Sequence, residues 1–307
     1  MLRARAAALG VSLALSLPGF ALAQSPLWPG APGVSPEVLT ALANAQQDNS
    51  ASLLALAEAG LSDAQVLVGS FYIFGVKGLV KDGVKGCDYE RKASASRADA
   101  MHLLGECYQF GYGGETDVEK ALVAFHRAGD MGSHKSRCAE GNVLFSLGRD
   151  EARAFGLCRE GAEAGDPDAQ TDVGNFYLVG QHVPKDVIAA RGWYEKAVAS
   201  SRQPNAALVL GQIYWNGDGV TKDREKAAAY WRVAYEGGRS DAAKFLGDEA
   251  LLRAGRGEGI WDPAGLEEAA DWYDKASASP VEAIRQEAIA RRDLARQLVG
   301  VMQRRAH

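Results

Sequence analysis

The chain has 307 residues, of which 47% are hydrophobic and 24% are charged, a balance typical of a folded protein and not of a disordered one. Acidic side chains outnumber basic ones by 39 to 34, which gives a formal net charge of −5. This excess argues against a phosphate-backbone partner, because such a partner requires a basic face. Nucleic acid is therefore not expected as a ligand.

The first 23 residues are typical of a secretory signal peptide. Arg3 and Arg5 precede an apolar run over residues 6–17, and Ala21-Leu22-Ala23 has the small residues of a cleavage site. The run is short for a membrane anchor, and no cysteine stands directly after the cleavage site to carry a lipid anchor. No later apolar stretch is long enough to span a bilayer. We therefore expect a periplasmic or secreted protein without membrane insertion.

A short N-terminal region follows the predicted leader. Residues 24–34 carry three of the ten prolines and predict an extended arm. Ser35 and Pro36 are typical of a helix start, with serine as N-cap and proline at the first helical position. Helices are expected over about 35–47 and 50–59, and they would form an N-terminal pair that ends at residue 60.

From residue 61 onward one glycine recurs at nearly fixed intervals. In five of six copies it follows an Asp or Asn by six residues and a Leu or Val by one. The spacings are 36, 36, 33, 37 and 36 residues between Gly69, Gly105, Gly141, Gly174, Gly211 and Gly247. Periods of this size indicate stacked helical repeats, so the sequence predicts an all-α solenoid of about six repeats over residues 61–279.

Each repeat is expected to contain two antiparallel helices. The first would start at the Asp or Asn as N-cap, carry an aromatic residue three positions after the glycine, and end at a second glycine. These aromatic and terminal residues are Tyr72, Tyr108, Tyr177 and Tyr214, and Gly75, Gly111, Gly180 and Gly217. The recurrent glycine costs about 1 kcal/mol relative to alanine inside a helix, so we expect it to allow close approach of the second helix.

These residues resemble the Sel1-like repeat family, which is related to the tetratricopeptide repeat. The stretch 205–238 holds nearly the whole family pattern: Leu210-Gly211, Tyr214, Gly217, Asp223, Lys226-Ala227 and Tyr230. The third repeat departs most, with Leu144 at the tyrosine position and a connection three residues shorter. The resemblance implies a right-handed α-solenoid of stacked antiparallel helix pairs, with residues 280–307 as its C-terminal capping helix.

The four cysteines fall into two equally spaced pairs. Cys87 and Cys107 are 20 residues apart, and so are Cys138 and Cys158. In an antiparallel helix pair, residues equidistant from the turn lie side by side, and both midpoints fall in predicted connections. Disulfides also persist in the compartments that a signal peptide leads to. We predict the bridges Cys87–Cys107 and Cys138–Cys158, with buried free thiols as the alternative.

The sequence carries no motif of a catalytic or metal centre. Its histidines show no i,i+4 pair, no Cys-x-x-Cys occurs, and the glycine-rich stretch 111–114 lacks the Lys-Ser/Thr of a phosphate loop. Gly-x-Ser-x-Gly and Ser-x-x-Lys motifs are missing as well. We therefore expect no metal, no cofactor and no enzyme activity. Some cysteine-rich Sel1-like proteins have been linked to hydrolysis of β-lactam or cell-wall compounds, so a hydrolase is the less favoured alternative.

The first helices of the repeats supply a candidate binding face. Residues three before, one after and four after the recurrent glycine share one helical side, which lines the concave groove in the related tetratricopeptide fold. The middle position is polar in every repeat, and the last is mostly apolar or aromatic. The candidate partner-binding residues are Ser70, His102, Glu106, Gln109, Asn142, Phe145, Asn175, Leu178, Gln212 and Trp215. Packing between adjacent repeats is the alternative for the apolar members.

The sequence favours an exported scaffold that binds a protein or peptide partner through the concave face of the solenoid. The resemblance narrows the partner classes, because exported Sel1-like proteins include immunity proteins that neutralise type VI secretion effectors. They also include regulators of membrane sensor kinases and partners of cell-wall enzymes. The leading hypothesis is the scaffold, with an immunity protein as one narrower hypothesis and a periplasmic regulator of a sensor kinase or cell-wall enzyme as the alternative.

Overall fold

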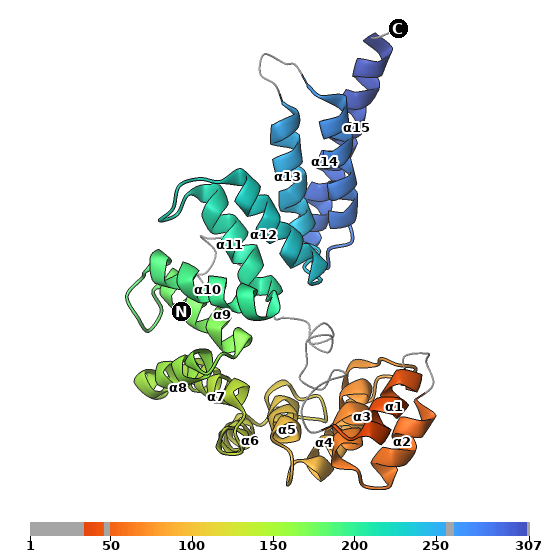
Figure 1. Ribbon diagram of the computed structural model, residues 1–307, viewed down its shortest axis with the longest axis vertical. Helices are drawn as coiled ribbons and strands as arrows, with labels where there is room; N and C mark the ends of the chain where they lie inside the picture. The colour runs from red at the N-terminus through yellow and green to blue at the C-terminus, as the bar shows by residue number, and fades with distance from the viewer. Residues whose placement is uncertain (1–33, 46–49, 256–260, 306–307) are drawn as a thin grey trace. The chain divides into compact units, whose positions relative to one another are not determined.

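The computed structural model describes residues 34–45, 50–255 and 261–305, and the predicted signal peptide lies outside them. Fifteen α-helices make up this part of the chain (Figure 1), which contains no strand beyond one isolated bridge between Gly255 and Trp261. The prediction of an all-α chain is confirmed. The helices belong to two compact units that divide between Ser133 and His134.

Both units consist of antiparallel helix pairs in succession, as predicted. The first unit contains α1 (Pro36–Ala45), α2 (Ala51–Glu58), α3 (Ser62–Phe74), α4 (Gly83–Ala93), α5 (Ala98–Phe110) and α6 (Val118–Asp130). The second contains α7 (His134–Ser146), α8 (Glu151–Glu163), α9 (Pro167–Val179), α10 (Val187–Ser201), α11 (Pro204–Asn216), α12 (Arg224–Glu236), α13 (Ala242–Ala254), α14 (Pro263–Ala276) and α15 (Glu282–Arg305). We call the first helix of each repeat, from α3 to α13, its A helix and the second its B helix.

The connection inside a repeat is built in the same way in both units. Gly75, Gly111, Gly180 and Gly217 end their A helices with φ between +68° and +78°, which confirms the predicted left-handed ending. An aspartate then caps the B helix. In α12 its side chain accepts the Lys226 N–H at 2.9 Å, and its own N–H donates to the carbonyl of Tyr214 at 3.0 Å. The equivalent bonds recur around the capping residues Asp82, Asp117 and Asp186.

The recurrent glycine lies where the A and B helices of a repeat touch. A Cβ placed on it would come within 2.6 Å of a ring carbon in four repeats, at Gly105–Phe125, Gly174–Tyr194, Gly211–Trp231 and Gly247–Tyr273. At Gly69 the clash would be with the carboxyl group of Glu90. The prediction that the glycine allows close approach of the second helix is confirmed.

The predicted N-cap of the A helices is wrong in four repeats. Asp63, Asp99, Asp168 and Asn205 lie at the second helical position, and the caps are Leu61, Arg97, Asp166 and Gln203. In two of the four, the side chain is engaged one repeat further along the chain: Asp168 accepts from Gln203, and Asn205 accepts from Arg239. These oxygen atoms accept hydrogen bonds from the next repeat and do not cap their own helix. The N-cap of that helix is the residue two positions earlier.

The A helices lie on the inner side of the stack within each unit. α3 packs directly on α5, α7 on α9, and α9 on α11, whereas no two B helices of the described chain pack on each other to this extent. In a curved array, equivalent helices of adjacent repeats come closest on the inner side, so helices that contact one another across a repeat lie on that side. The surface of the A helices is therefore the concave one in each unit.

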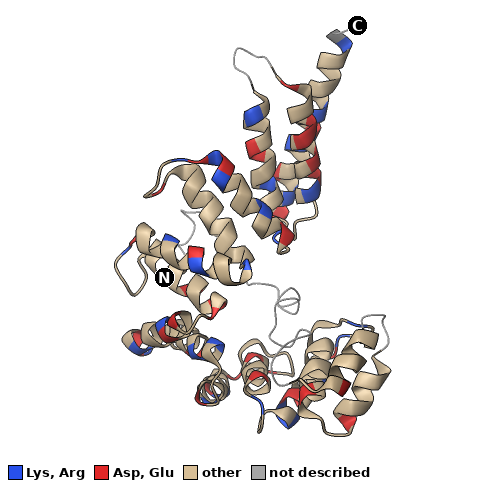
Figure 2. Cartoon of the chain, viewed as in Figure 1, with Lys and Arg blue, Asp and Glu red and all other residues tan. Residues whose placement is uncertain are grey.

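The long helix α15 packs along α14 and contacts α13. Ala288 and Val299 are buried in its interface with the last repeat. Acidic and basic residues are interspersed along α13, α14 and α15 (Figure 2), and Arg291 donates to Asp248 at 2.6 Å. None of the described helices combines the length and the apolar character that a membrane span requires.

Candidate partner-binding face

Six of the predicted binding residues lie together on consecutive A helices of the second unit. They are partly exposed and come from α7, α9 and α11 (Figure 1): Asn142, Phe145, Asn175, Leu178, Gln212 and Trp215. We call this surface the A-helix face. Its amides can donate and accept hydrogen bonds, and its rings and aliphatic groups supply apolar contact area.

The predicted residues of the first unit differ in exposure. Ser70 and His102 are only 1% and 6% exposed, so their side chains are part of the interior. His102 Nε2 lies 3.3 Å from Glu106 Oε1, and its ring contacts that of Phe125. Glu106 and Gln109 are partly exposed. In this unit, Glu106 and Gln109 are the predicted residues that a partner can reach.

The polar residue after the recurrent glycine has a structural role that the sequence pattern did not reveal. Tyr194 donates from its hydroxyl to Asn175 Oδ1 at 2.8 Å, and Tyr273 donates to Asp248 Oδ1 at 2.8 Å. Burial raises the pKa of both tyrosines, so they remain protonated donors. For Tyr194 the sequence signal is its place eight residues after the capping residue Asp186, whereas Tyr273 stands eleven residues after Asp262.

Both predicted disulfides are present. Cys87 and Cys107 join α4 to α5, with Cα atoms 6.0 Å apart, and Cys138 and Cys158 join α7 to α8. In the third repeat, Cys158 stands where the other B helices carry a ring or Glu90, and a Cβ on Gly141 would come within 3.2 Å of its Sγ. The disulfide thus replaces the ring-on-glycine contact of the regular repeats.

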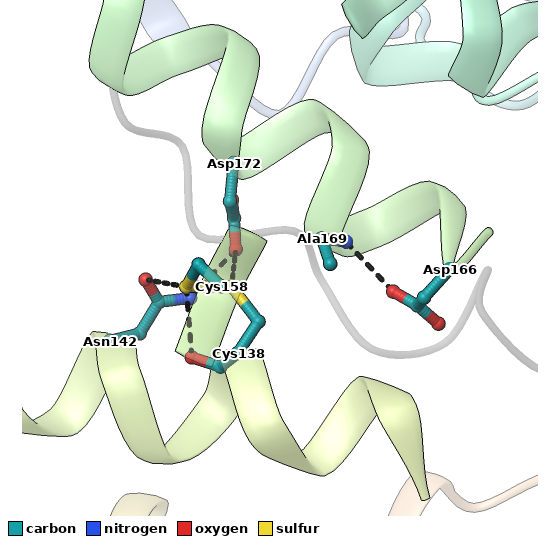
Figure 3. Close-up of a disulfide and its surroundings, with 6 residues drawn as sticks. All are labelled: Cys138, Asn142, Cys158, Asp166, Ala169 and Asp172. Atoms are coloured by element: carbon teal, nitrogen blue, oxygen red, sulfur yellow. Dashed lines mark hydrogen bonds between the residues drawn. A yellow bond between two sulfur atoms is a disulfide. The ribbon is translucent and has the colours of Figure 1, made fainter. Parts of the chain in front are cut away.

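Asp172 is a residue of this region that the sequence analysis missed. It extends from α9 toward the Cys138–Cys158 disulfide (Figure 3), and its Oδ2 accepts from Asn142 Nδ2 at 2.7 Å. The same oxygen lies 3.5 Å from Cys138 Sγ. Loss of contact with water raises the pKa of Asp172 to about 7, and the bond from Asn142 opposes that rise only in part.

The apolar members of the face are partly engaged in packing, which was the alternative left open for them. The Phe145 ring stacks on His182, with centroids 3.9 Å apart, and lies 4.8 Å from that of Phe176. Trp215 contacts Trp231, and the Arg224 guanidinium lies 5.7 Å from its ring centre. These rings are therefore held in place by neighbours and still present a partly exposed side.

The described residues contain no group of three or more His, Cys, Asp or Glu arranged to hold a metal ion. The A-helix face is formed by partly exposed side chains of three consecutive A helices. The Sel1 repeat model matches the chain over residues 62–96, 98–133, 140–166, 167–201, 204–238 and 242–280. The chain belongs to the Sel1 repeat family. Members of this family are typically non-enzymatic solenoid scaffolds.

Solved structures show the same fold. The chain is similar to a Sel1 repeat protein from Oxalobacter formigenes, with a TM-score of 0.58, 23% identity, and coverage of 81% of this chain and 100% of that one. It is also similar to an immunity protein from Pseudomonas aeruginosa, with a TM-score of 0.50, 20% identity, and coverage of 76% and 81%. At this level of identity the likeness concerns the fold alone.

A curated relative extends the comparison to sequence. An uncharacterized protein from Neisseria meningitidis serogroup B is 30% identical over 192 residues, which are 62% of this chain and 40% of the relative. The chain thus spans two fifths of the length of that relative.

Proposed function

We propose that the chain is an exported scaffold that binds another protein through the A-helix face of its second unit. The observation that carries this proposal is the alignment of six partly exposed residues along three consecutive A helices on the inner side of the stack. Solenoids use surfaces of this kind to hold extended partners.

The side chains of the A-helix face are suited to recognition because several are already held in place. Asn142 is bonded to Asp172, and Asn175 accepts from Tyr194, so little rotamer freedom is lost on binding. Trp215 adds the residue type most enriched at the energetic centre of protein interfaces. A partner would gain amide hydrogen bonds beside an aromatic contact.

Export is supported by the two disulfides, because such bridges form and persist in oxidising compartments. The predicted signal peptide points the same way and lies outside the described residues. We therefore place the scaffold in the periplasm or in the secreted fraction.

The narrower proposal is that the partner is a toxic type VI secretion effector that the chain neutralises. It is supported by the family membership and by the fold shared with an immunity protein from Pseudomonas aeruginosa. A periplasmic regulator of a sensor kinase or cell-wall enzyme is the alternative within the same scaffold function.

The scaffold proposal is tested by capture of partners on the tagged chain from periplasmic extract, beginning with the products of adjacent genes. Calorimetry then compares the wild-type chain with Trp215→Ala and Gln212→Ala. We expect each substitution to weaken binding about tenfold or more, as truncation at a binding hot spot does. Val123→Ala, at an exposed position on the B helix α6, is the control and should leave the Kd unchanged. Full binding by both face variants would show that the partner does not use the A-helix face.

The immunity proposal has a separate readout. The captured partner is expressed in a susceptible strain with and without this chain, and growth is followed. We expect growth arrest by the partner alone and rescue by the wild-type chain, with weaker rescue by Trp215→Ala. A stable complex whose partner is harmless to cells would exclude an immunity role and favour the regulator.

A further inference from the structure

A cavity of about 380 Å³ lies in the second unit, at the end of the helix pair α11–α12 and beside α10. It is lined by residues 219–223 of the connection together with Arg191, Tyr214 and Lys226. None of these is among the six residues of the A-helix face. The cavity is a second concave site with its own chemistry.

Positive charge dominates the lining of this cavity. Arg191 comes from α10, Lys222 from the connection and Lys226 from the first turn of α12. Asp223 is the one acidic residue of the lining, and its Oδ1 caps α12 by accepting the Lys226 N–H. Glu195 stands behind the lining, where it accepts from the Tyr214 hydroxyl at 3.0 Å. Three cations against two carboxylates leave the site with about one positive charge, within a chain that is acidic as a whole.

The preceding repeat shows what is unusual here. Arg191 stands five residues after the B-helix capping residue Asp186, and the equivalent residue of α8 is Phe155. Phe155 packs edge-on against Tyr177, with ring centroids 6.0 Å apart. At the next junction Tyr214 occupies the position of Tyr177. Arginine thus stands where the earlier junction has a packed ring, and the cavity lies beside it.

The guanidinium of Arg191 has unused hydrogen-bonding capacity. Its Nε is shut off from solvent, makes no hydrogen bond among the described residues and forms an ion pair with Glu195 Oε1 at 3.6 Å. An anion that enters the cavity would meet the terminal nitrogens of this side chain, which is 29% exposed. Lys226, in contrast, already donates to the Tyr214 hydroxyl at 2.7 Å and lies over that ring. An incoming anion would therefore gain charge-assisted bonds chiefly from Arg191 and Lys222.

We propose that this cavity is a carboxylate-binding site that accepts an Asp or Glu side chain of a protein partner. A single carboxylate would neutralise a net charge near one, whereas a doubly charged phosphate would leave excess negative charge beside Asp223 and Glu195. The planar fork of arginine is matched to the two oxygens of a carboxylate. The inference rests on the proposed function in one respect: it assumes that the carboxylate belongs to a protein partner.

The test uses a short peptide in place of the native partner, so that it stands apart from the A-helix face. The full chain is titrated at low salt with blocked tetraglutamate, blocked tetraglutamine and inorganic phosphate. The side-chain Nε–H signal of Arg191 and the amide signals of Gly219 and Thr221 are followed by NMR. We expect tetraglutamate to shift these signals with a Kd of about 1 mM. Equal binding of tetraglutamine, or tighter binding of phosphate, would overturn the assignment.

Substitutions locate the binding. Arg191→Met combined with Lys222→Met should weaken tetraglutamate binding about tenfold or more, because it removes the two cations with free donors. Lys196→Met, at an exposed position on the same helix, is the control and should leave binding unchanged. Thermal unfolding checks that each variant is folded. Unaltered binding by the folded double variant would refute the site, whatever the outcome of the partner-capture experiment.

Discussion

The Tyr194 ring crosses the A helix at Gly174, so closely that a Cβ on this glycine would stand 2.6 Å from ring carbon Cε1. Beyond the glycine, the tyrosine hydroxyl reaches the side chain of Asn175 on the same helix. Gly247, Tyr273 and Asp248 repeat the arrangement. The recurrent glycine and the polar residue after it therefore act together: one makes room for the ring, and the other satisfies its hydroxyl.

This arrangement predicts opposite effects for two glycine-to-alanine substitutions in the same repeat. Gly174→Ala should lower the free energy of unfolding by about 1–3 kcal/mol, because overpacking against Tyr194 outweighs the gain in helix propensity. Gly192→Ala in α10 should raise it by up to about 1 kcal/mol, since a Cβ there meets no atom within 4 Å. Urea unfolding followed by circular dichroism measures both. Stabilisation by Gly174→Ala would show that the ring contact does not need the glycine.

The architecture was predictable from the sequence because a repeat leaves its period in the residues that close each helix pair. The period of the glycine predicted the helix pairs, and the equal spacing of the cysteines predicted both bridges. Sequence could not separate an N-cap from the second helical position, because an acidic residue is favourable at either place. Asp168 illustrates the ambiguity: its side chain accepts from Gln203 of the next repeat, a contact that exists only after the repeats stack.

The candidate binding face was predictable only in part. A polar residue on a helical face looks solvent-facing in the sequence, yet Asn175 accepts a hydrogen bond from a neighbouring helix. Ser70 and His102 occupy predicted face positions and are buried. The spacing of residues along one helix shows which of them share a side. Whether they are exposed depends on the size of the side chains that a neighbouring helix packs against them. For this reason, exposure had to come from the structure.

The bond between Tyr194 and Asn175 can be tested without disturbing the ring. Tyr194→Phe keeps the contact with Gly174 and removes the donor, so it should cost about 1 kcal/mol of unfolding free energy, the usual net value of a hydrogen bond. Tyr235→Phe, at a partly exposed position on α12, is the matched control and should change stability by less than about 0.5 kcal/mol. Equal effects of the two variants would mean that the hydroxyl bond contributes nothing particular.

The two disulfides should contribute to stability by comparable amounts, because each closes a loop of the same length. Loop-closure entropy gives about 3 kcal/mol for each. Replacement of Cys138 and Cys158 by alanine should also speed hydrogen exchange in α7 and α8, since this repeat lacks the ring-on-glycine contact. Replacement of Cys87 and Cys107 is the matched control and should leave exchange in α7 and α8 unaltered. Unchanged protection of α7 and α8 after loss of their own bridge would contradict this.

The partly buried carboxyl group of Asp172 predicts a pH dependence of stability. Its pKa is raised to about 7 in the folded chain, against about 3.9 when unfolded. Between these values the folded state holds a proton that the unfolded chain has lost, so this group's contribution is fully present below about pH 4 and is lost as the pH rises through 7.

Asp172→Asn removes that titration and retains an oxygen that can accept from Asn142. The variant should therefore gain stability relative to the wild-type chain as the pH rises from about 4 to 7, and the difference should level off above that range. Val179→Ala, at an exposed position on the same helix, changes no titratable group, serves as the control and should show a flat difference over the same range. Urea unfolding at a series of pH values gives both curves. A difference for Asp172→Asn that does not change with pH would mean that the carboxylate is accommodated in its charged form, with the Asn142 amide outweighing the loss of water.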